Sequence, residues 1–312
     1  MRNAGRAVRL VSHRVATLIV LLVAVFAAVE ALPGDAAGAT ADRGATAAEL
    51  HARRAALGLD RPLATRFWDW MSGLPTGDLG TTARGEHVTD VLSGPFPNTL
   101  LLGALALVLA VSGALLLGSW AALRPGGRTD RTIDAAATTT FALPEFVVSV
   151  ALLLLLSQWA GWLPAVTLTG PDGKPESWTM IVLPLLALAL PQIGWNTRIV
   201  RGALADQAAL PHVKAAILDG LPRRRILSHH MLPGALPAVA AGIATSAGML
   251  LGGAVVVETL FNYPGIGAVL AGAITDRDTP LVAGVVAGAG AAITLLLLLA
   301  DLVRTTALGE RR

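Results

Sequence analysis

"HVKAAILDGLPRRRILSHHMLP" (residues 212–233) is a charged connector between two long apolar runs. Pro211 precedes it and Gly220 lies inside it. Proline suits the first turn of a helix, and glycine suits the left-handed residue that follows a helix end. The pattern therefore predicts a short helix over residues 212–219.

The side chains of this short helix divide into two groups. Val213, Ala216 and Ile217 fall on one face at helical spacing. Lys214 and Asp219 lie off that face. The apolar face needs a surface to pack on, because a helix of this length is marginal in water by itself.

Pro222 is predicted to start a second helix that carries Arg223, Arg224 and Arg225 and stops near Pro233. Two interpretations of the connector are open. In the first, it lies on the bilayer surface with its arginines near anionic headgroups. In the second, it fits a groove on a cytoplasmic protein.

The composition of the 312-residue chain is that of a membrane protein. Hydrophobic residues make up 54% of it and charged residues only 14%. The chain has no cysteine, so it forms neither a disulfide framework nor a thiolate metal site. Its arginines cluster beside apolar runs rather than among aromatic residues, which favours membrane orientation over nucleic-acid binding.

Six apolar stretches are candidates for crossing a bilayer, which requires about 20 residues of helix. They are residues 15–32, 99–123, 135–159, 181–195, 236–257 and 281–300. The fourth is the shortest and contains Pro184 and Pro191, so its limits are the least defined. The first has an alternative interpretation as a secretory signal peptide, because arginines precede it.

The positive-inside rule orients these spans. The basic residues of the N-terminus, of the connectors at 124–131 and 198–225 and of the C-terminus all fall on one face, which is predicted to be cytoplasmic. Both chain ends then lie in the cytoplasm. The opposite face holds residues 33–98, 163–180 and 258–280.

Polar residues inside the spans are candidates for a translocation path, because such residues usually face a bundle interior or an aqueous cavity. Glu145 follows Pro144 within the third stretch, and a carboxylate at mid-bilayer costs about 3 kcal/mol. The alternative for Glu145 is a position at a helix end, in contact with headgroups or with a structural partner. Gln192 and Asn196 are further candidates, although local polarity also satisfies a carbonyl freed by a proline.

Two external segments carry further predictions. In "ETLFNYPGIG" (258–267), one proline and two glycines predict a turn, while Phe261, Tyr263 and Ile266 are predicted to anchor at the membrane interface. Residues 40–60 have helical propensity, and they would dock another protein or form an ordered lid.

No enzymatic or metal-binding motif is present. The sequence lacks H-E-x-x-H, G-x-S-x-G and the nucleotide-binding G-x-x-x-x-G-K-[ST], which argues against an intramembrane enzyme and against ATP hydrolysis by this chain. The adjacent His229 and His230 point in different directions, so no metal site is predicted. An ion-coupled secondary transporter would need paired ionisable residues in several spans, and only Glu145 is clearly deep.

The connector resembles the EAA loop of ABC-transporter permeases. Ala215, Ala216, Gly220, Leu232 and Pro233 hold the places of the family pattern, whereas Lys214 replaces its leading glutamate and His230 its isoleucine. Further segments resemble the first permease subunit of the dipeptide, oligopeptide and nickel importers. They are "LPGD" (32–35), "LGLDRP" (57–62), "GDLGTT" (77–82), "NTLLLG" (98–103), "WAALRPGGRTDR" (120–131), "GWLP" (161–164), "GGAVVVETLFNYPGIG" (252–267) and "DRDTPLVAG" (276–284).

The resemblance implies an all-helical permease of six transmembrane helices in a bacterial plasma membrane. It implies a second permease subunit, two cytoplasmic ATPases that hold the ATP and magnesium, and an external solute-binding protein. This chain itself binds no cofactor. Peptides are the favoured cargo, with nickel or a nickel chelate as the alternative, because members with different cargo share these motifs.

The resemblance also implies roles for particular residues. The coupling residues are Val213, Lys214, Ala215, Ala216, Ile217, Asp219 and Gly220. The external gate region contains Glu258, Phe261, Tyr263, Pro264 and Gly265. The expected organisation is a cytoplasmic N-terminus (1–14), a first span (15–32), a long external loop (33–98), a five-helix core (99–303) with the coupling loop at 211–233, and a cytoplasmic C-terminus (304–312).

Overall fold

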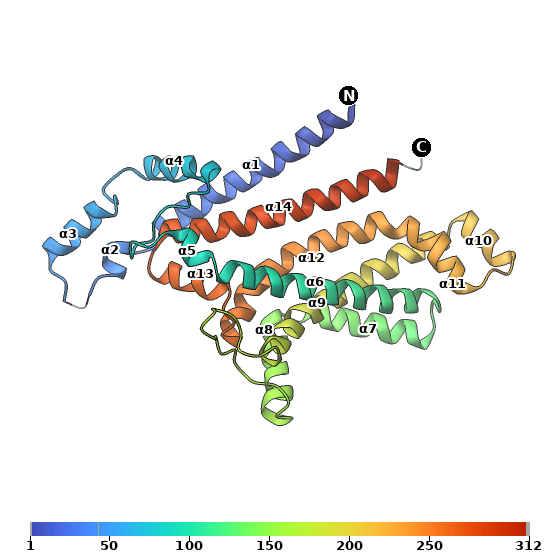
Figure 1. Ribbon diagram of the computed structural model, residues 1–312. Helices are drawn as coiled ribbons and strands as arrows, with labels where there is room; N and C mark the ends of the chain where they lie inside the picture. The colour runs from blue at the N-terminus through green and yellow to red at the C-terminus, as the bar shows by residue number, and fades with distance from the viewer. Residues whose placement is uncertain (1, 43, 310–312) are drawn as a thin grey trace. The chain divides into compact units, whose positions relative to one another are not determined.

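A computed structural model describes residues 2–42 and 44–309 of the chain (Figure 1). Of the basic residues used to orient the chain, Arg311 and Arg312 lie outside the described residues. Nearly all of the ordered structure is helical. The described residues form no strand of a sheet, only two isolated bridges, between Thr81 and His87 and between Thr169 and Pro175.

The chain divides into two compact units. The first unit comprises residues 1–99, 171–174 and 264–294, and the second comprises 100–170, 175–263 and 295–312. The helices of the first unit are α1 (Arg2–Glu30), α2 (Ala36–Ala39), α3 (Ala47–Ala56), α4 (Leu63–Gly73), the 3-10 turn η1 (Leu74–Thr76), α5 (Val88–Leu92), α13 (Ile266–Thr275) and the first half of α14 (Thr279–Gly309).

The first unit is held together by apolar packing between helices far apart in sequence. Phe26 of α1 meets Phe67 of α4 edge to face, with ring centroids 5.4 Å apart, and both pack near Trp70. Gly290 of α14 lets Leu18 of α1 approach, since a Cβ there would lie 2.4 Å from the leucine. The helical propensity of residues 40–60 is confirmed for the part that forms α3. A capping box of Thr46 and Glu49 begins this helix.

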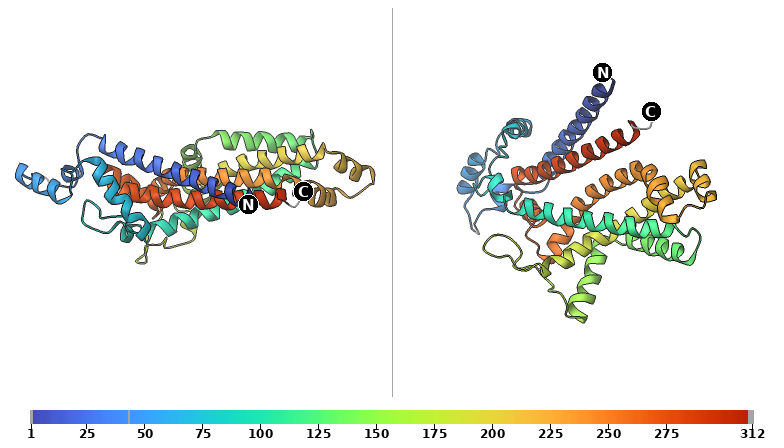
Figure 2. Two further views of the ribbon diagram at one scale, coloured as in Figure 1. Left: turned by 90° about the horizontal axis from the view of Figure 1, so that it is seen from above. Right: turned by 45° about the vertical axis from the view of Figure 1, so that its right-hand side comes forward.

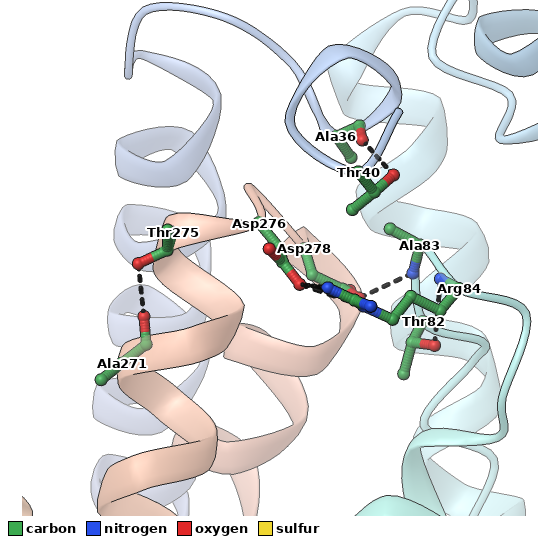
Figure 3. A network of polar contacts seen from close by, with 9 residues as sticks. All are labelled: Ala36, Thr40, Thr82, Ala83, Arg84, Ala271, Thr275, Asp276 and Asp278. Carbon is green, nitrogen blue, oxygen red and sulfur yellow. Dashed lines mark hydrogen bonds and ion pairs between the residues drawn. The ribbon is translucent and has the colours of Figure 1, made fainter. Parts of the chain in front are cut away.

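Polar contacts join the segments predicted for the external face. Arg84 pairs with Asp276 at 2.8 Å, and the Asp278 carboxylate accepts the Ala83 N–H at 2.6 Å (Figure 3). The Asn98 side chain donates to the Gly173 carbonyl at 2.9 Å and to the Pro264 carbonyl at 2.8 Å. Parts of all three segments, 33–98, 163–180 and 258–280, therefore meet in one unit.

The helices of the second unit surround α9. They are most of α6 (Pro95–Ala122), α7 (Arg128–Ala142), α8 (Glu145–Leu152), the π-helical η2 (Leu153–Trp159), α9 (Thr179–Ala208), α10 (Pro211–Leu218), α11 (Arg223–Arg225), the π-helical η3 (Ile226–Met231) and α12 (Leu232–Phe261). Helix α9 packs against α7, α8 and α12 (Figures 1 and 2). Its core with α12 includes Leu183, Leu188 and Leu250, which are almost completely buried.

Five helices are long and apolar enough to cross a membrane, and the number rises to six if one bent pair counts as a single span. The bent pair is where the sequence-based expectation was wrong. The stretch 135–159 is not one helix, because α7 ends at Ala142 and α8 begins at Glu145, with a bend of 103°. Leu143 is extended, as a residue before proline prefers, and Pro144 opens the new helix.

Other span limits also differ from those expected. Helix α1 begins at Arg2 rather than residue 15 and ends at Glu30, and its apolar part runs over Val11–Glu30. Helix α9 extends to Ala208 and continues through Pro184 and Pro191. Neighbouring helices accommodate such prolines inside a membrane, so the two prolines do not end the helix.

Asp278 gives a prediction about pH. Burial raises the pKa of its carboxyl above the usual 3.8, although the hydrogen bonds from the Ala83 and Leu281 N–H groups oppose the shift. The contribution of a group with a raised pKa is fully present below pH 3.8 and is lost as the pH rises through the folded pKa. The stability that this residue contributes should therefore decrease between acidic and neutral pH. The thermal unfolding temperature of the purified protein, measured over that pH range, should show the decrease.

Asp278→Asn removes the titration and should flatten the pH dependence of the unfolding temperature. The exposed Asp60→Asn serves as the matched control and should behave like the wild type. An unchanged pH profile in Asp278→Asn would contradict the predicted contribution.

Candidate functional site

The coupling loop forms the short helix that the sequence predicts. Helix α10 begins at Pro211 and ends at Leu218, and Gly220 has a φ of 73°. The Gly220 N–H donates to the Ile217 carbonyl at 3.1 Å, and the Leu221 N–H donates to the Ala216 carbonyl at 3.2 Å. These two bonds make a Schellman motif, which fixes the direction in which the chain leaves the helix.

The two faces of α10 have different surroundings. Val213 and Ala216 are buried in a cluster that includes Leu204 of α9 and Ala235 of α12. Ile217 was expected to share that face, but 56% of it is exposed, and Leu218 is 87% exposed. The expectation was wrong because the buried face centres between Val213 and Ala216, and Ile217 lies about 100° around the helix from Ala216, at the edge of that face.

The remaining coupling residues lie on the open side of the loop. Lys214, Ala215, Asp219 and Gly220 are all exposed. The buried pair therefore fixes α10 to the body of its own unit, and the exposed residues are available to a partner.

The second helix of the loop starts after Pro222, as predicted, but it does not stop near Pro233. It passes from α11 through the π-helical η3 into α12 as one run that ends at Phe261. Pro233 lies in the first turn of α12. Because a π-helix bonds residue i to i+5, the local register change accommodates a proline that would interrupt an α-helix.

The adjacent His229 and His230 have separate surroundings. His230 contacts His212, with ring centroids 6.5 Å apart, and its carbonyl lies 3.3 Å from His212 Nε2. His229 Nδ1 lies 2.7 Å from the Ser228 hydroxyl. No group of three or more potential metal ligands occurs among the residues that the structure describes.

An ion pair braces α9 beside the coupling loop. Arg201 of α9 contacts Asp130 of α7 at 2.5 Å and Asp134 at 3.3 Å. The Asp130 carboxylate also accepts the Gly126 N–H at 2.8 Å, in the turn between α6 and α7. Arg223 of α11 donates to the Leu123 carbonyl at 3.1 Å, so the same turn contacts the coupling loop.

The polar residues of α9 are deeply buried. Asn196 donates to Ser246 Oγ of α12 at 2.6 Å and to the Gln192 carbonyl at 2.9 Å. The side chain of Gln192 is fully buried, and neither its Oε1 nor its Nε2 has a hydrogen-bond partner among the described residues. Buried polar groups are usually paired, so this amide is unusual.

Gln192 and Glu145 line the same cavity. Its volume is about 370 Å³, and α7, α8, α9 and α12 contribute its walls. The lining residues are Phe141, Leu143, Pro144, Glu145, Phe146, Pro191, Gln192, Met249 and Val256. Asn196 does not reach this cavity but bridges α9 to α12 one turn away.

Glu145 is the first residue of α8, half-buried, at the break after Pro144. Its carboxylate lies against Gly253 of α12, where a Cβ would come within 2.2 Å of it. A carboxylate is favoured at a helix N-terminus by the free N–H groups of the first turn. Glu145 therefore lies at a helix end, and that helix end opens onto the cavity. Its role in a translocation path and its contact with headgroups stay predictions.

The three residues predicted to anchor this segment at the membrane interface are buried instead. Phe261 and Tyr263 are 1% exposed and Ile266 is 2% exposed, so they pack inside the protein. Burial raises the pKa of Tyr263 to about 12, and the nearby Glu258 adds to the shift. The apolar character of these side chains indicated that they avoid water, but it did not show whether lipid or protein surrounds them.

The backbone here makes the predicted turn. Asn262 is left-handed and ends α12, Pro264 accepts from Asn98, and Gly265 caps α13. Glu258 is fully buried. The Phe261 carbonyl accepts the Thr167 N–H at 2.8 Å, which connects the end of α12 to the loop before α9.

Several residues of the site were not found from the sequence. Asp130 and Arg201 are separated by 71 residues, and charge alone did not pair them. Ser246 received no role from the sequence, and Gly253 was noted only as part of the motif at 252–267. The spacing of Ser246 and Gly253, seven residues apart on α12, is the signal that both face one side of the helix.

Two family profiles match the chain. The profile described as "Binding-protein-dependent transport system inner membrane component" matches residues 114–306, and that of its N-terminal segment matches residues 7–102. The chain belongs to this family. It is therefore a permease subunit of an ABC importer and a multi-pass membrane protein, and the ion-coupled transporter and the intramembrane enzyme are set aside.

Individual relatives agree with this family. The permease is 30% identical over 299 residues, 95% of each chain, to a Sinorhizobium fredii protein named "Probable peptide ABC transporter permease protein". It is 32% identical over 267 residues, 85% of each chain, to the "Glutathione transport system permease protein" of Pectobacterium atrosepticum.

Solved structures support the fold. An amino acid ABC transporter crystallised with histidines has a TM-score of 0.52 at 17% identity, over 70% of the permease and 94% of that chain. A methionine ABC transporter in an inward-facing conformation has a TM-score of 0.50 at 18% identity, with the same coverage. At these identities the likeness concerns the fold alone.

Gly220 gives a prediction for the coupling loop. A side chain there meets no atom within 4 Å, so Gly220→Val is opposed only by the left-handed backbone. That conformation costs a non-glycine residue about 1–2 kcal/mol, and a β-branched residue tolerates it poorly. We expect Gly220→Val to impair solute uptake while membrane insertion stays normal.

Gly202→Val is the matched control for Gly220→Val. Gly202 is also exposed and unobstructed, but its backbone is helical. Uptake and membrane content should be measured for both variants. Uptake at the wild-type level in Gly220→Val would show that the left-handed end of α10 is not needed for transport.

Arg201 gives a prediction about the brace beside the loop. Arg201→Leu leaves the buried Asp130 carboxylate with the Gly126 N–H as its remaining partner. The free energy of unfolding should fall by roughly 1.5–3 kcal/mol, the usual range for hydrogen bonds to charged groups.

A second change should restore part of that stability. Asp130→Asn in the Arg201→Leu background removes the unpaired charge. Arg198→Leu, on an exposed position of the same helix, is the control. Equal unfolding temperatures for Arg201→Leu and Arg198→Leu would show that the ion pair contributes nothing.

Proposed function

We propose that this permease moves short peptides inward and is driven by cytoplasmic ATPases that bind the exposed side of α10. The observation that carries the proposal is the division of α10 into a buried face, Val213 and Ala216, and an exposed apolar side, Ile217 and Leu218. Such a helix is rigidly attached to one protein and offers an apolar contact to another.

The cargo follows from the relatives. One is named for peptide transport and the other for glutathione, which is itself a tripeptide. Peptide cargo therefore agrees with both names.

The attachment of α10 suits the transmission of force. Its buried face packs on α9 and α12, and the Schellman motif at Gly220 fixes its exit. Helix α9 carries Gln192 and Asn196, which lie in the same continuous helix as the packing surface for α10. A movement imposed on α10 therefore reaches the cavity through α9 alone. A continuous, packed helix of this kind can transmit a rigid-body movement between two sites.

The other components follow from the same proposal. A second, related permease completes the membrane pathway, two ATPases hold ATP and magnesium, and this chain holds neither. An external solute-binding protein delivers the peptide. The termini and the coupling loop lie in the cytoplasm, since the basic residues gather in those segments.

The bilayer surface is the competing partner for α10, and charge reversal distinguishes the two. Leu218→Asp and Leu218→Lys both place a charge where an apolar groove would receive a leucine, so both should lower ATPase binding. An anionic lipid surface would reject aspartate but accept lysine. We expect both variants to lose ATPase subunits in pull-downs from gently solubilised membranes.

Leu63→Asp is the control for these variants, because Leu63 is also a partly exposed leucine but lies in α4. The wild-type pull-down should contain a second permease, ATPases and a solute-binding protein by mass spectrometry. Recovery of ATPase with Leu218→Lys but not with Leu218→Asp would favour the lipid surface. Recovery of the chain alone from wild-type membranes would overturn the proposed function.

A further inference from the structure

Polar atoms without partners gather on a short part of α9. Besides the Gln192 amide, Trp195 Nε1 and Thr197 Oγ1 are buried and lack a hydrogen-bond partner among the described residues. Burying an unpaired amide costs roughly 1–3 kcal/mol in proteins. Asn196, in the same segment, donates from its Nδ2 both to Ser246 and to the α9 backbone, so burial alone does not explain the unpaired Gln192.

The cavity beside Gln192 has the composition of a ligand site. Its volume of about 370 Å³ falls within the ~300–1,000 Å³ usual for small-molecule sites. Most of the lining is apolar, including Phe141, Met249 and Val256, and Glu145 and Gln192 are its two polar side chains. Few polar groups in an apolar wall are the usual means of orienting a ligand.

Glu145 is the one ionisable side chain among the lining residues of this cavity. The described residues provide no ion-pair partner for Glu145 within 4.0 Å. Gly253 leaves room for the Glu145 carboxylate, and any larger residue at position 253 would displace it. A carboxylate without a protein cation, beside an amide without a partner, fits a ligand that carries an ammonium group next to a peptide bond.

We propose that this cavity is a subsite for the amino end of a short peptide. The Glu145 carboxylate pairs with the peptide ammonium, the Gln192 amide hydrogen-bonds the first peptide group, and Phe141, Met249 and Val256 receive the first side chain. The inference rests on the proposed function, since it supplies the peptide class that the permease carries.

The test uses the permease complex with its partner subunits in lipid nanodiscs, without the solute-binding protein. Binding of radiolabelled trialanine is compared with binding of N-acetyl-trialanine, which has no ammonium group. The wild type should bind trialanine saturably and the acetylated peptide at least tenfold more weakly, which corresponds to about 1.4 kcal/mol.

The variants make the test specific to the proposed contacts. Glu145→Gln should weaken trialanine binding about tenfold and abolish the discrimination against the acetylated peptide. Gln192→Leu should weaken both peptides to a similar extent. Gly253→Ala should act like Glu145→Gln, because its methyl group displaces the carboxylate while the charge remains.

The controls are exposed residues of the same types, Glu176→Gln and Gln158→Leu, and both should bind like the wild type. Three results would overturn the subsite: no saturable trialanine binding, equal binding of both peptides by the wild type, or equal weakening of both peptides in Glu145→Gln. The last would show that Glu145 only maintains the structure.

A separate measurement keeps this inference apart from the proposed function. ATPase activity of the wild-type complex is measured with and without its solute-binding protein and peptide. If ATPase activity is stimulated but the complex does not distinguish trialanine from N-acetyl-trialanine, the subsite proposal is wrong and the proposed function stands. Failure of the ATPases to associate with the permease removes the proposed function, whatever the nanodiscs bind.

Discussion

Close approach of helix backbones is the constraint on which the second unit depends. A Cβ on Gly194 would lie 2.5 Å from the Ala137 carbonyl, one on Gly118 2.7 Å from Val200, and one on Gly242 2.8 Å from Ile199. Apolar side chains gain little from leaving lipid, so helices in a membrane associate through such small residues and through interhelical hydrogen bonds. Helix α9 uses both, since Asn196 bonds to Ser246 across the contact with α12.

This packing explains why one helix connects the cavity to the coupling loop. Helix α9 remains continuous through Pro184 and Pro191 because its neighbours enclose it. Arg201 then fixes its C-terminal half to α7 through Asp130. The polar groups of α9 therefore have two different roles. Asn196 and Arg201 bind it to neighbouring helices, whereas the Gln192 amide lines a cavity.

Local sequence signals predicted local structure well. Pro211 and Gly220 marked both ends of α10 because each acts on the backbone within its own turn. Long-range features were harder. The face of Ile217, the burial of Phe261 and Tyr263, and the pairing of Arg201 with Asp130 depend on which distant segment lies opposite. Hydropathy counted the apolar residues of 135–159 correctly, yet it did not reveal the bend, because two helices at 103° have the same composition as one straight helix.

The break at Pro144 also has a consequence for depth. Helix α7 has 15 residues, so it rises about 22 Å, whereas the hydrocarbon core is about 30 Å thick. If α7 enters at one edge of the core, its end at Ala142 stops short of the other edge. The last carbonyl groups of α7 and the first N–H groups of α8 then lie within the lipid's thickness, and the protein itself must surround them with polar contacts or water.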